Sequence, residues 1–190
     1  MSDRRRLIVE AALRVIARDG VSAATHRAVA AEAGVPLAST TYHFSSKAEI
    51  VTEALELAID RSIAAVERHT APPLPATADA LVERLAELAG ALCADDQAPL
   101  AAQYELLIEA GRSPPLQRVA ERWDGAYMAG LRAIVAGARI PAPGQAAEIL
   151  SDLIDGALLD LVASPREGFV EETLRPRLAR VVAGLGIIAA

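Results

Sequence analysis

Apolar residues recur every three to four positions along most of the chain, which is the spacing of one face of an α-helix. Leu7, Ala11 and Val15 follow this spacing in the first segment, and Gly20 ends it. Glycines, prolines and the acidic pair Asp95-Asp96 interrupt the pattern at intervals. We therefore expect an all-α protein of nine helices, with bounds near 4–19, 25–33, 37–43, 46–69, 77–94, 97–111, 115–138, 144–163 and 167–186.

The segment Ser22–Phe44, SAATHRAVAAEAGVPLASTTYHF, predicts two short helices joined by a tight turn. Thr25 is suited to cap the first helix, Gly34 to end it in the left-handed conformation, and Pro36 to open the second. The second helix, about Leu37–His43, is too short and polar to be stable alone, but its small side chains allow a partner to approach closely. This is the layout of a DNA-binding helix-turn-helix, although many ordinary helical hairpins share it.

The later helices predict a body joined to this three-helix head by a long connector. Helix 46–69 should be about 36 Å long at roughly 1.5 Å per residue, which is enough to bridge head and body. Pro176 falls inside the last predicted helix, so it should either kink that helix or mark its true beginning.

Composition and charge agree with this organisation. Hydrophobic residues make up 53% of the chain but aromatic residues only 3%, so the core must consist mainly of Ala, Leu, Val and Ile. The formal net charge is −6, yet residues 1–50 hold seven basic and five acidic side chains, which leaves −8 on the rest. A mildly basic head on an acidic body fits a DNA-binding domain fused to a regulatory domain, because phosphate attraction is local. A chance fluctuation would give the same difference.

The sequence offers no signal for catalysis, secretion or membrane insertion. It has no apolar run of 18 residues, and MSDRRRL is not followed by a signal-peptide core, so we expect a cytoplasmic protein. The histidines His26, His43 and His69 and the lone Cys93 lack metal-ligand spacing, and no nucleophile motif, phosphate loop or dinucleotide fingerprint occurs. We expect no enzyme activity, no cofactor and no metal, and a buried or reduced thiol at Cys93.

Four pieces of the head together form a specific pattern. They are LIVEAALRVIARDG, the Thr-x-Arg-x-Val-Ala of residues 25–30, the Ala-Gly-Val turn of residues 33–35, and Tyr42-His43-Phe44 followed by Lys47. This assembly resembles the tetracycline-repressor (TetR) family of transcriptional regulators over the first 50 to 60 residues, and the remainder resembles it in helix count and order. Pro36, Leu37 and Thr40-Thr41 depart from the family pattern, so no member's operator sequence transfers to this chain.

The resemblance implies a DNA-binding transcriptional regulator, a repressor released from a palindromic operator by a small-molecule effector. It assigns residues 1–45 to a helix-turn-helix DNA-binding domain and residues 46–190 to a ligand-binding and dimerisation domain. The alternative is a helical protein–protein interaction module that does not bind DNA. That alternative leaves the small, hydroxyl-rich second helix of the motif unexplained.

The predicted DNA contacts fall into two groups. On the second helix, hydroxyl groups are expected to bond base edges or phosphate, Leu37 and Ala38 to touch thymine methyls, and Tyr42 to lie in the groove or on the backbone. The second group is Thr25, Arg27, His43 and Lys47, for which the matching family positions imply phosphate contacts. The full set is Thr25, Arg27, Leu37, Ala38, Ser39, Thr41, Tyr42, His43 and Lys47. Arg4, Arg5 and Arg6 are either a phosphate-binding arm or a solvated charge run.

The resemblance also implies an effector site and a homodimer. Candidate contacts for a small, largely apolar effector are residues with adaptable or polar-tipped side chains, although such residues are more often plain core: Cys93, Tyr104, Ile108, Trp123, Tyr127 and Met128. The last two helices carry broad apolar stripes, which predict a four-helix-bundle dimer interface or, alternatively, the closure of the monomer core. These residues are Ile149, Leu150, Leu153, Ile154, Ala157, Leu158, Leu161, Leu174, Leu178 and Val181. Asp152 and Asp155 could pair across the dimer or face the pocket.

Overall fold

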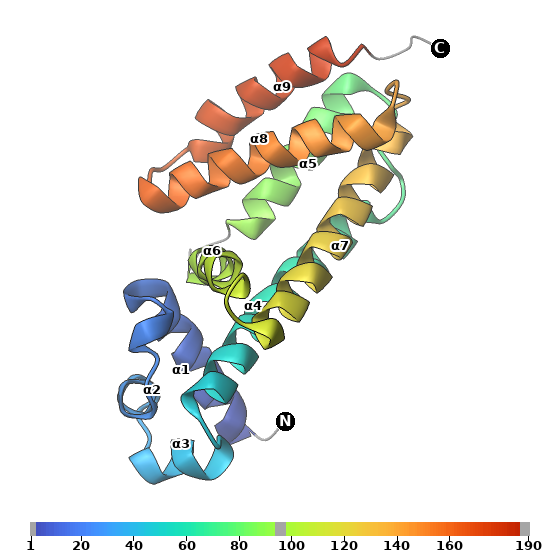
Figure 1. The fold of residues 1–190 in the computed structure, drawn as a ribbon. Coiled ribbons are helices and arrows are strands. Elements are labelled where there is room, and N and C mark those ends of the chain that lie inside the picture. The colour runs from blue at the N-terminus through green and yellow to red at the C-terminus, as the bar shows by residue number, and fades with distance from the viewer. Residues whose placement is uncertain (1–2, 94–97, 187–190) are drawn as a thin grey trace. The chain divides into compact units, whose positions relative to one another are not determined.

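The computed structural model describes residues 3–93 and 98–186, and all regular structure among them is helical (Figure 1). This confirms the all-α prediction, and the described residues form the nine expected α-helices. The expected interruption at Asp95-Asp96 lies outside the described residues. The α-helices are α1 (Asp3–Asp19), α2 (His26–Ala33), α3 (Leu37–His43), α4 (Lys47–Thr70), α5 (Ala78–Leu92), α6 (Ala98–Ala110), α7 (Pro114–Gly137), α8 (Pro143–Ala163) and α9 (Arg175–Gly184).

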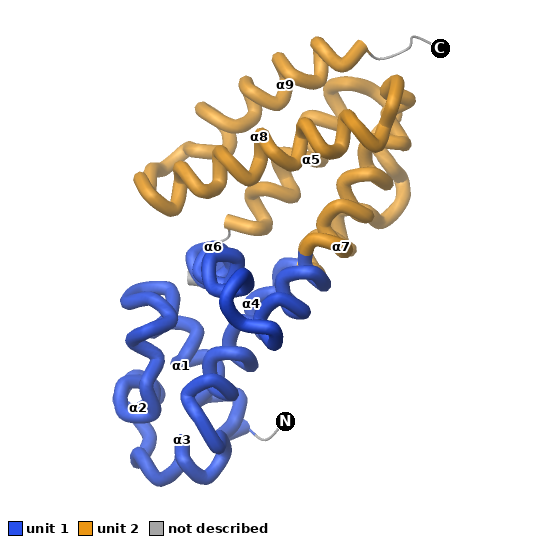
Figure 2. Tube along the Cα trace, in the orientation of Figure 1, with its two compact units in different colours: residues 1–62, 96–123 blue, residues 63–95, 124–190 orange. Residues whose placement is uncertain are grey.

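The chain divides into two compact units, which Figure 2 colours separately. Unit 1 comprises Met1–Ser62 and Asp96–Trp123, and unit 2 comprises Ile63–Asp95 and Asp124–Ala190. The helices α4 and α7 therefore each contribute residues to both units. The functional boundary between residues 45 and 46 stays a prediction.

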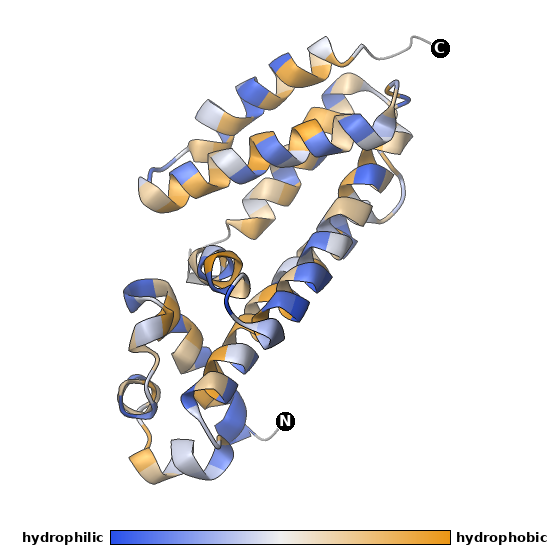
Figure 3. Ribbon diagram, in the orientation of Figure 1, coloured by the Kyte–Doolittle hydropathy of each residue, from blue (hydrophilic) through white to orange (hydrophobic). Residues whose placement is uncertain are grey.

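Unit 1 is built around α1. Its apolar face, which includes Ile8, Ala12 and Ile16, is fully buried, and α1 contacts both α2 and α6. Val29 and Phe44 are also buried. The polar side of α1 is attached to α2 by charge, because Arg14 Nε and Arg18 Nη1 donate to Glu32 oxygens at 2.8 and 3.0 Å. Figure 3 shows that the helices carry both hydrophobic and hydrophilic positions along their length.

Unit 2 packs α5 against α9 and against a short π-helical turn, η2 (Phe169–Leu174), while α8 contacts α9 and η2. Thr77 caps α5 by accepting a hydrogen bond from the Ala80 N–H at 3.2 Å. Leu81, Leu85 and Leu88 of α5 have no exposed surface. The core is thus aliphatic, as the composition predicted.

The end of the chain corrects one boundary. A single helix was expected over 167–186, but the π-turn occupies Phe169–Leu174 and α9 begins only at Arg175. Pro176 lies in the first turn of α9, where the missing N–H of proline leaves no helical hydrogen bond unmade. Pro176 therefore marks the true beginning of the last α-helix, which was one of the two expected outcomes.

Within unit 2, α4 and α7 approach closely because position 130 has no side chain. A Cβ atom at Gly130 would collide with Val66 Cγ1 and would lie 3.2 Å from Thr70 Cγ2. Gly125, also on α7, has nothing within 4 Å of the corresponding position.

We predict that Gly130→Ala lowers the free energy of unfolding by about 1–3 kcal/mol, because the added methyl group forces the two helices apart. Gly125→Ala is the matched control. It is expected to be neutral or to stabilise by up to about 1 kcal/mol, since alanine is the better helix former. Urea unfolding at one fixed protein concentration measures both. Equal effects of the two substitutions would contradict the close approach at Gly130.

Candidate nucleic-acid interface and effector pocket

The two helices of the predicted motif are α2 and α3, and the expected local signals are present. The Thr25 Oγ1 accepts a hydrogen bond from the Ala28 N–H at 3.2 Å, which caps α2. Gly34 follows α2 in the left-handed conformation with φ 63° and ψ 34°, and Pro36 directly precedes α3. The turn between the helices is therefore fixed by its own sequence.

One residue of α3 faces inward. Thr40 is the only fully buried residue of the helix, and its hydroxyl donates to the Leu37 carbonyl at 2.8 Å and reaches the His26 carbonyl of α2 at 3.5 Å. Leu37, Ala38 and Thr41 are exposed, and Ser39 is half-buried. Tyr42 is 84% exposed, which is unusual for so large an aromatic side chain and leaves it available to a partner.

The predicted phosphate contacts surround this exposed face. Thr25 and Arg27 are exposed, and Arg27 forms no ion pair with any residue that the structure describes. His43 is half-buried, with its ring in an edge-on contact with the Tyr42 ring at 5.0 Å. Lys47 Nζ donates to the Ser22 carbonyl at 2.5 Å, which ties the start of α4 to the 3₁₀ turn η1 (Val21–Ala23). An ammonium carries three donors, so this bond does not exhaust Lys47.

The arginines at the chain start differ in their environments. Arg4 and Arg6 are exposed, and Arg6 has one weak contact to Glu10 at 4.0 Å. The Arg5 guanidinium instead binds inside unit 1, to Glu49, to Glu53 and to the carbonyl oxygen of His43. Arg5 is therefore neither part of a phosphate-binding arm nor a solvated charge. The sequence signal for this site was the spacing of Glu49 and Glu53, which places two carboxylates one turn apart on α4.

Glu49 organises the entry to α4. Its carboxylate accepts hydrogen bonds from both the N–H and the hydroxyl of Ser45 at 2.7 Å, while the Ser46 hydroxyl accepts one from the Glu49 N–H at 3.2 Å. The bonds from Ser45, joined by the one from Arg5, lower the pKa of Glu49 to about 2. The carboxylate is therefore charged at neutral pH and in mild acid.

The six predicted effector contacts are divided between the two units. Tyr104, Ile108 and Trp123 belong to unit 1, whereas Cys93, Tyr127 and Met128 belong to unit 2. Trp123 and Tyr127 are buried, Ile108 is 63% exposed, and the other three are half-buried. Burial raises the pKa of the Cys93 thiol to about 11, which suppresses its reactive thiolate form. Ligand contact by these six residues stays a prediction.

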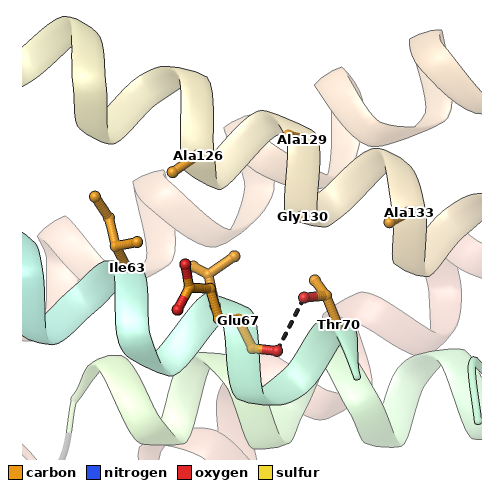
Figure 4. Close-up of a pocket in the computed structure, with 8 residues that line it drawn as sticks. Ile63, Glu67, Thr70, Ala126, Ala129, Gly130 and Ala133 are labelled. Carbon is orange, nitrogen blue, oxygen red and sulfur yellow. Dashed lines mark hydrogen bonds between the residues drawn. The ribbon is translucent and has the colours of Figure 1, made fainter. Parts of the chain in front are cut away.

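A cavity of about 310 Å³ lies in unit 2 between α4 and α7 (Figure 4). Small side chains of α7 form one wall, and Glu67 is its one charged lining residue. In Figure 4 the side chains of Ile63 and Glu67 extend from α4 into the space in front of Ala126. The lining is Ile63, Val66, Glu67, Thr70, Ala126, Ala129, Gly130 and Ala133. These positions were not predicted from the sequence, because the candidates were adaptable or polar-tipped side chains, whereas most of this lining is alanine, glycine, isoleucine and valine.

A second cavity, of about 380 Å³, lies in unit 1 and borders Lys47. It is formed by the start of α4, the turn η1 and the segment joining α6 to α7. Its lining is Val21, Lys47, Ala48, Val51, Thr52, Glu109, Ser113 and Leu116.

The two aspartates on α8 occupy different environments. Asp152 is exposed, whereas Asp155 is partly buried, and its Oδ2 accepts a hydrogen bond from the Ser151 hydroxyl at 3.2 Å. Burial raises the pKa of Asp155 to about 6, although hydrogen bonds from Ser151 and Tyr127 act in the opposite direction. The like charges of Asp152 and Asp124 add to the upward shift.

Most residues of the predicted dimer interface are covered within the single chain. Seven of the ten have at most 3% of their surface exposed, namely Leu150, Ile154, Ala157, Leu158, Leu161, Leu174 and Leu178. A partner chain would therefore contact the residues around them. Leu153 and Val181 are half-buried, and Ile149 is 41% exposed. Leu159, which was not in the predicted set, is 50% exposed on α8. The interface assignment stays a prediction.

Comparison with known proteins identifies the family. Residues 8–66 match the family model of bacterial regulatory proteins of the tetR family, and residues 76–184, more than half of the chain, match that of a tetracyclin repressor-like C-terminal domain. The chain belongs to the TetR family. This family consists of transcriptional regulators and is in general not enzymatic, and its membership confirms the resemblance found in the head.

Individual relatives of this TetR-family chain differ in how much they cover. HdnoR, a nicotine-responsive transcriptional repressor of Paenarthrobacter nicotinovorans, is 32% identical over 114 residues, so the match spans 59% of this chain and only 57% of that repressor. The multidrug binding protein EbrR, solved in complex with ethidium, is 33% identical with a TM-score of 0.66, covering 94% of this chain and 98% of EbrR. A Rhodococcus sp. Rha1 regulator has a TM-score of 0.79, covering 97% of this chain and 99% of its own. At 23% identity it supports the fold alone.

Two further observations concern only residues 3–93 and 98–186. None of their helices combines the length and the apolar character that a membrane span requires. No group of three or more His, Cys, Asp or Glu side chains among them is arranged to hold a metal ion.

We predict that Asp155→Asn raises the free energy of unfolding at pH 7 by about 1 kcal/mol, because it removes a charge whose burial is unfavourable. The folded pKa of about 6 exceeds the ordinary value of 3.8, so the folded state binds more protons in this interval. The stability of the unmodified protein should therefore fall as the pH rises from about 4 to 7, and the variant should show less of this fall.

Urea unfolding between pH 4 and pH 7 checks this prediction, with the exposed Asp152→Asn on the same helix as control. The control is expected to change stability by no more than about 0.5 kcal/mol. A loss of stability at pH 7 in Asp155→Asn would show that the carboxylate is favourably bound.

Proposed function

We propose that this TetR-family chain is a homodimeric repressor that binds a palindromic duplex operator and is released from it by a small-molecule effector. The observation that carries the proposal is the outer face of α3, where Tyr42 is 84% exposed, while Thr40 on the opposite face is fully buried. A large exposed aromatic side chain on a short, rigidly held helix suits insertion into a major groove.

In this proposal the exposed face of α3 reads the bases. Leu37 and Ala38 touch thymine methyl groups, Ser39 and Thr41 bond base edges or phosphate, and Tyr42 lies in the groove or on the sugar-phosphate backbone. The face has no Arg, Asn or Gln. Without a bidentate reader of guanine or adenine, DNA shape and bridging water must contribute to discrimination.

Phosphate contacts position the head. We assign this role to Thr25, Arg27, His43 and Lys47. Arg27 is the strongest single candidate, because it is exposed and has no ion pair within the described part of the chain. Such contacts strengthen binding to every duplex alike and make it sensitive to salt.

The dimer is proposed to form through α8 and α9, with the two copies building a four-helix bundle. Support comes from apolar surface on α8 that the single chain leaves uncovered, at Ile149 and Leu159. Arg177 and Arg180 are exposed on α9, opposite in charge to the exposed Asp152 of α8. A two-fold operator requires a two-fold protein, with recognition helices roughly 34–36 Å apart or a multiple of one DNA turn.

The effector is proposed to bind in residues 46–190. The cavity between α4 and α7 supports a small ligand with a largely apolar body. Glu67 at its edge forms no ion pair with any residue that the structure describes, which favours a ligand with a basic nitrogen. Two relatives support this choice, since HdnoR is nicotine-responsive and EbrR, a multidrug binding protein, was solved in complex with ethidium and with imidazole. Nicotine, ethidium and imidazole are therefore the first compounds to test.

Because the proposed partner is genomic duplex, we place this function in the cytoplasm. The functional domains would be residues 1–45 for DNA binding and residues 46–190 for ligand binding and dimerisation. The second candidate function, a helical module that binds protein only, predicts no salt-dependent affinity for duplex DNA.

Fluorescence anisotropy with duplex from the chain's own promoter region, at two salt concentrations, tests the proposal. We expect salt-sensitive binding that is lost when Tyr42 and Lys47 are both changed to alanine. Arg118→Ala, on α7 outside the helix-turn-helix, removes one exposed charge and should leave binding unchanged within about twofold. Absence of binding to any duplex, including those from a genome-wide selection, would leave the protein-binding module.

The two proposed roles separate in single variants. Lys47→Ala is expected to weaken binding to all duplexes by a similar factor and to reduce the slope of log affinity against log salt by about 1. Tyr42→Ala is expected to change the preference among duplexes as well. If Lys47→Ala altered only the preference, its assignment as a phosphate contact would be wrong.

Release by an effector implies reciprocity, because operator and effector affinities must change each other by the same factor. A compound that weakens operator binding should itself bind about as many times more weakly when saturating operator is present. Titration of the compound with and without operator measures this, and equal affinities would reject the proposed switch.

A further inference from the structure

The geometry of unit 1 points to Arg5 as a positioning residue of the DNA interface. We propose that its guanidinium fixes the C-terminal end of α3 to the first two turns of α4, so that the orientation of α3 follows α4. This inference rests on the proposed function for its consequence in DNA binding. The contacts that carry it are independent of that function.

Arg5 forms hydrogen bonds to both α3 and α4. Arg5 Nε donates to Glu53 Oε2 at 3.0 Å, and Nη2 donates to Glu49 Oε1 at 3.0 Å and to Glu53 Oε1. Nη1 donates to the carbonyl oxygen of His43, the last residue of α3. Four of the five N–H groups of the guanidinium are thus directed at α4 and α3.

The flat, charged guanidinium group suits this position. The guanidinium carbon lies 4.3 Å from the centre of the Phe44 ring, so the planar group stacks on the residue that links α3 to α4. The two carboxylates raise the pKa of Arg5 further above its ordinary value. A fork of fixed geometry reaches a carbonyl and two carboxylates at once, which a lysine ammonium cannot do in the same arrangement.

The short helix α3 needs a bond of this kind to keep its orientation. A helix of seven residues has few internal hydrogen bonds, so its orientation depends on outside attachments. Thr40 is fully buried in the middle of α3, on the side of α3 that contacts α2. The Arg5 bond to the His43 carbonyl attaches the other end, beside Tyr42. Loss of this bond would leave the C-terminal end of α3 held by side-chain packing, including that of the buried Phe44, without a hydrogen bond from α1.

The same geometry argues against a direct phosphate contact. The Arg5 side chain is only 26% exposed, whereas that of Arg6, the next residue on α1, is 65% exposed. The two arginines therefore form a matched pair with equal charge and neighbouring positions but different surroundings.

The experiment compares Arg5→Gln and Arg5→Lys with the control Arg6→Gln in the full chain. The measurements are affinity for the operator, affinity for a scrambled duplex, the salt slope of each, thermal unfolding, and amide hydrogen exchange over residues 40–44 without DNA.

For Arg5→Gln we expect operator affinity to fall on the order of tenfold, the scale of one or two lost bonds to charged groups. Affinity for the scrambled duplex should change by less than about threefold and the salt slope should stay the same, because no phosphate contact is lost. Exchange over residues 40–44 should be several-fold faster than in Arg6→Gln. Arg5→Lys should lie between Arg5→Gln and the unmodified protein in both measurements.

Two outcomes would overturn the inference. One is a salt slope reduced by about 1 in Arg5→Gln with an unchanged ratio of operator to scrambled affinity, since this identifies a phosphate contact. The other is exchange over residues 40–44 equal to that in Arg6→Gln. If the unmodified protein binds no duplex, the proposed function fails, and the exchange comparison still decides whether Arg5 holds α3. If Arg5→Gln unfolds, the same comparisons with Arg5→Lys decide.

Discussion

The helix α3 is too short to hold itself, and the rest of unit 1 is arranged around this constraint. Several groups attach it: the left-handed turn at Gly34, the buried Thr40 on its inner face, and the Arg5 guanidinium, which binds its last carbonyl and lies over the buried Phe44. Because these attachments use the inner and terminal atoms of α3, its outer side chains remain uncommitted. The contacts that position the helix and the side chains that would read DNA thus lie on different faces of α3.

In unit 2 the same alanine-rich composition has a different effect. Small residues on α7 let α4 come close at Gly130, but one turn away on each side they fill less volume than leucine or phenylalanine would. The cavity between α4 and α7 therefore arises from side chains that are too small to close it. Glu67 lies exposed at the edge of this apolar space.

The sequence predicted local structure well because the responsible interactions lie within a few residues. The Thr25 cap, the Gly34 turn and the helix bounds all depend on neighbours in the chain. Periodicity identified the apolar face of α8, but it does not say what covers that face, and Leu150 and Ile154 proved to be buried by the chain's own core. Arg5 was missed for a similar reason, since its partners lie 38 to 48 positions away. The π-turn before α9 has no periodic signal at all.

The ionisable groups of the two units differ in their response to acid. In unit 1 the carboxylate of Glu49 has a pKa of about 2, and the Arg5 that it binds holds its proton more firmly than a free arginine. Asp155 of unit 2 has a pKa of about 6. Mild acidification would therefore leave the pair of Glu49 and Arg5 ionised while it protonates Asp155 in unit 2. The ion pair that joins α1 to the start of α4 and the partly buried carboxyl group of α8 would thus respond to different ranges of pH.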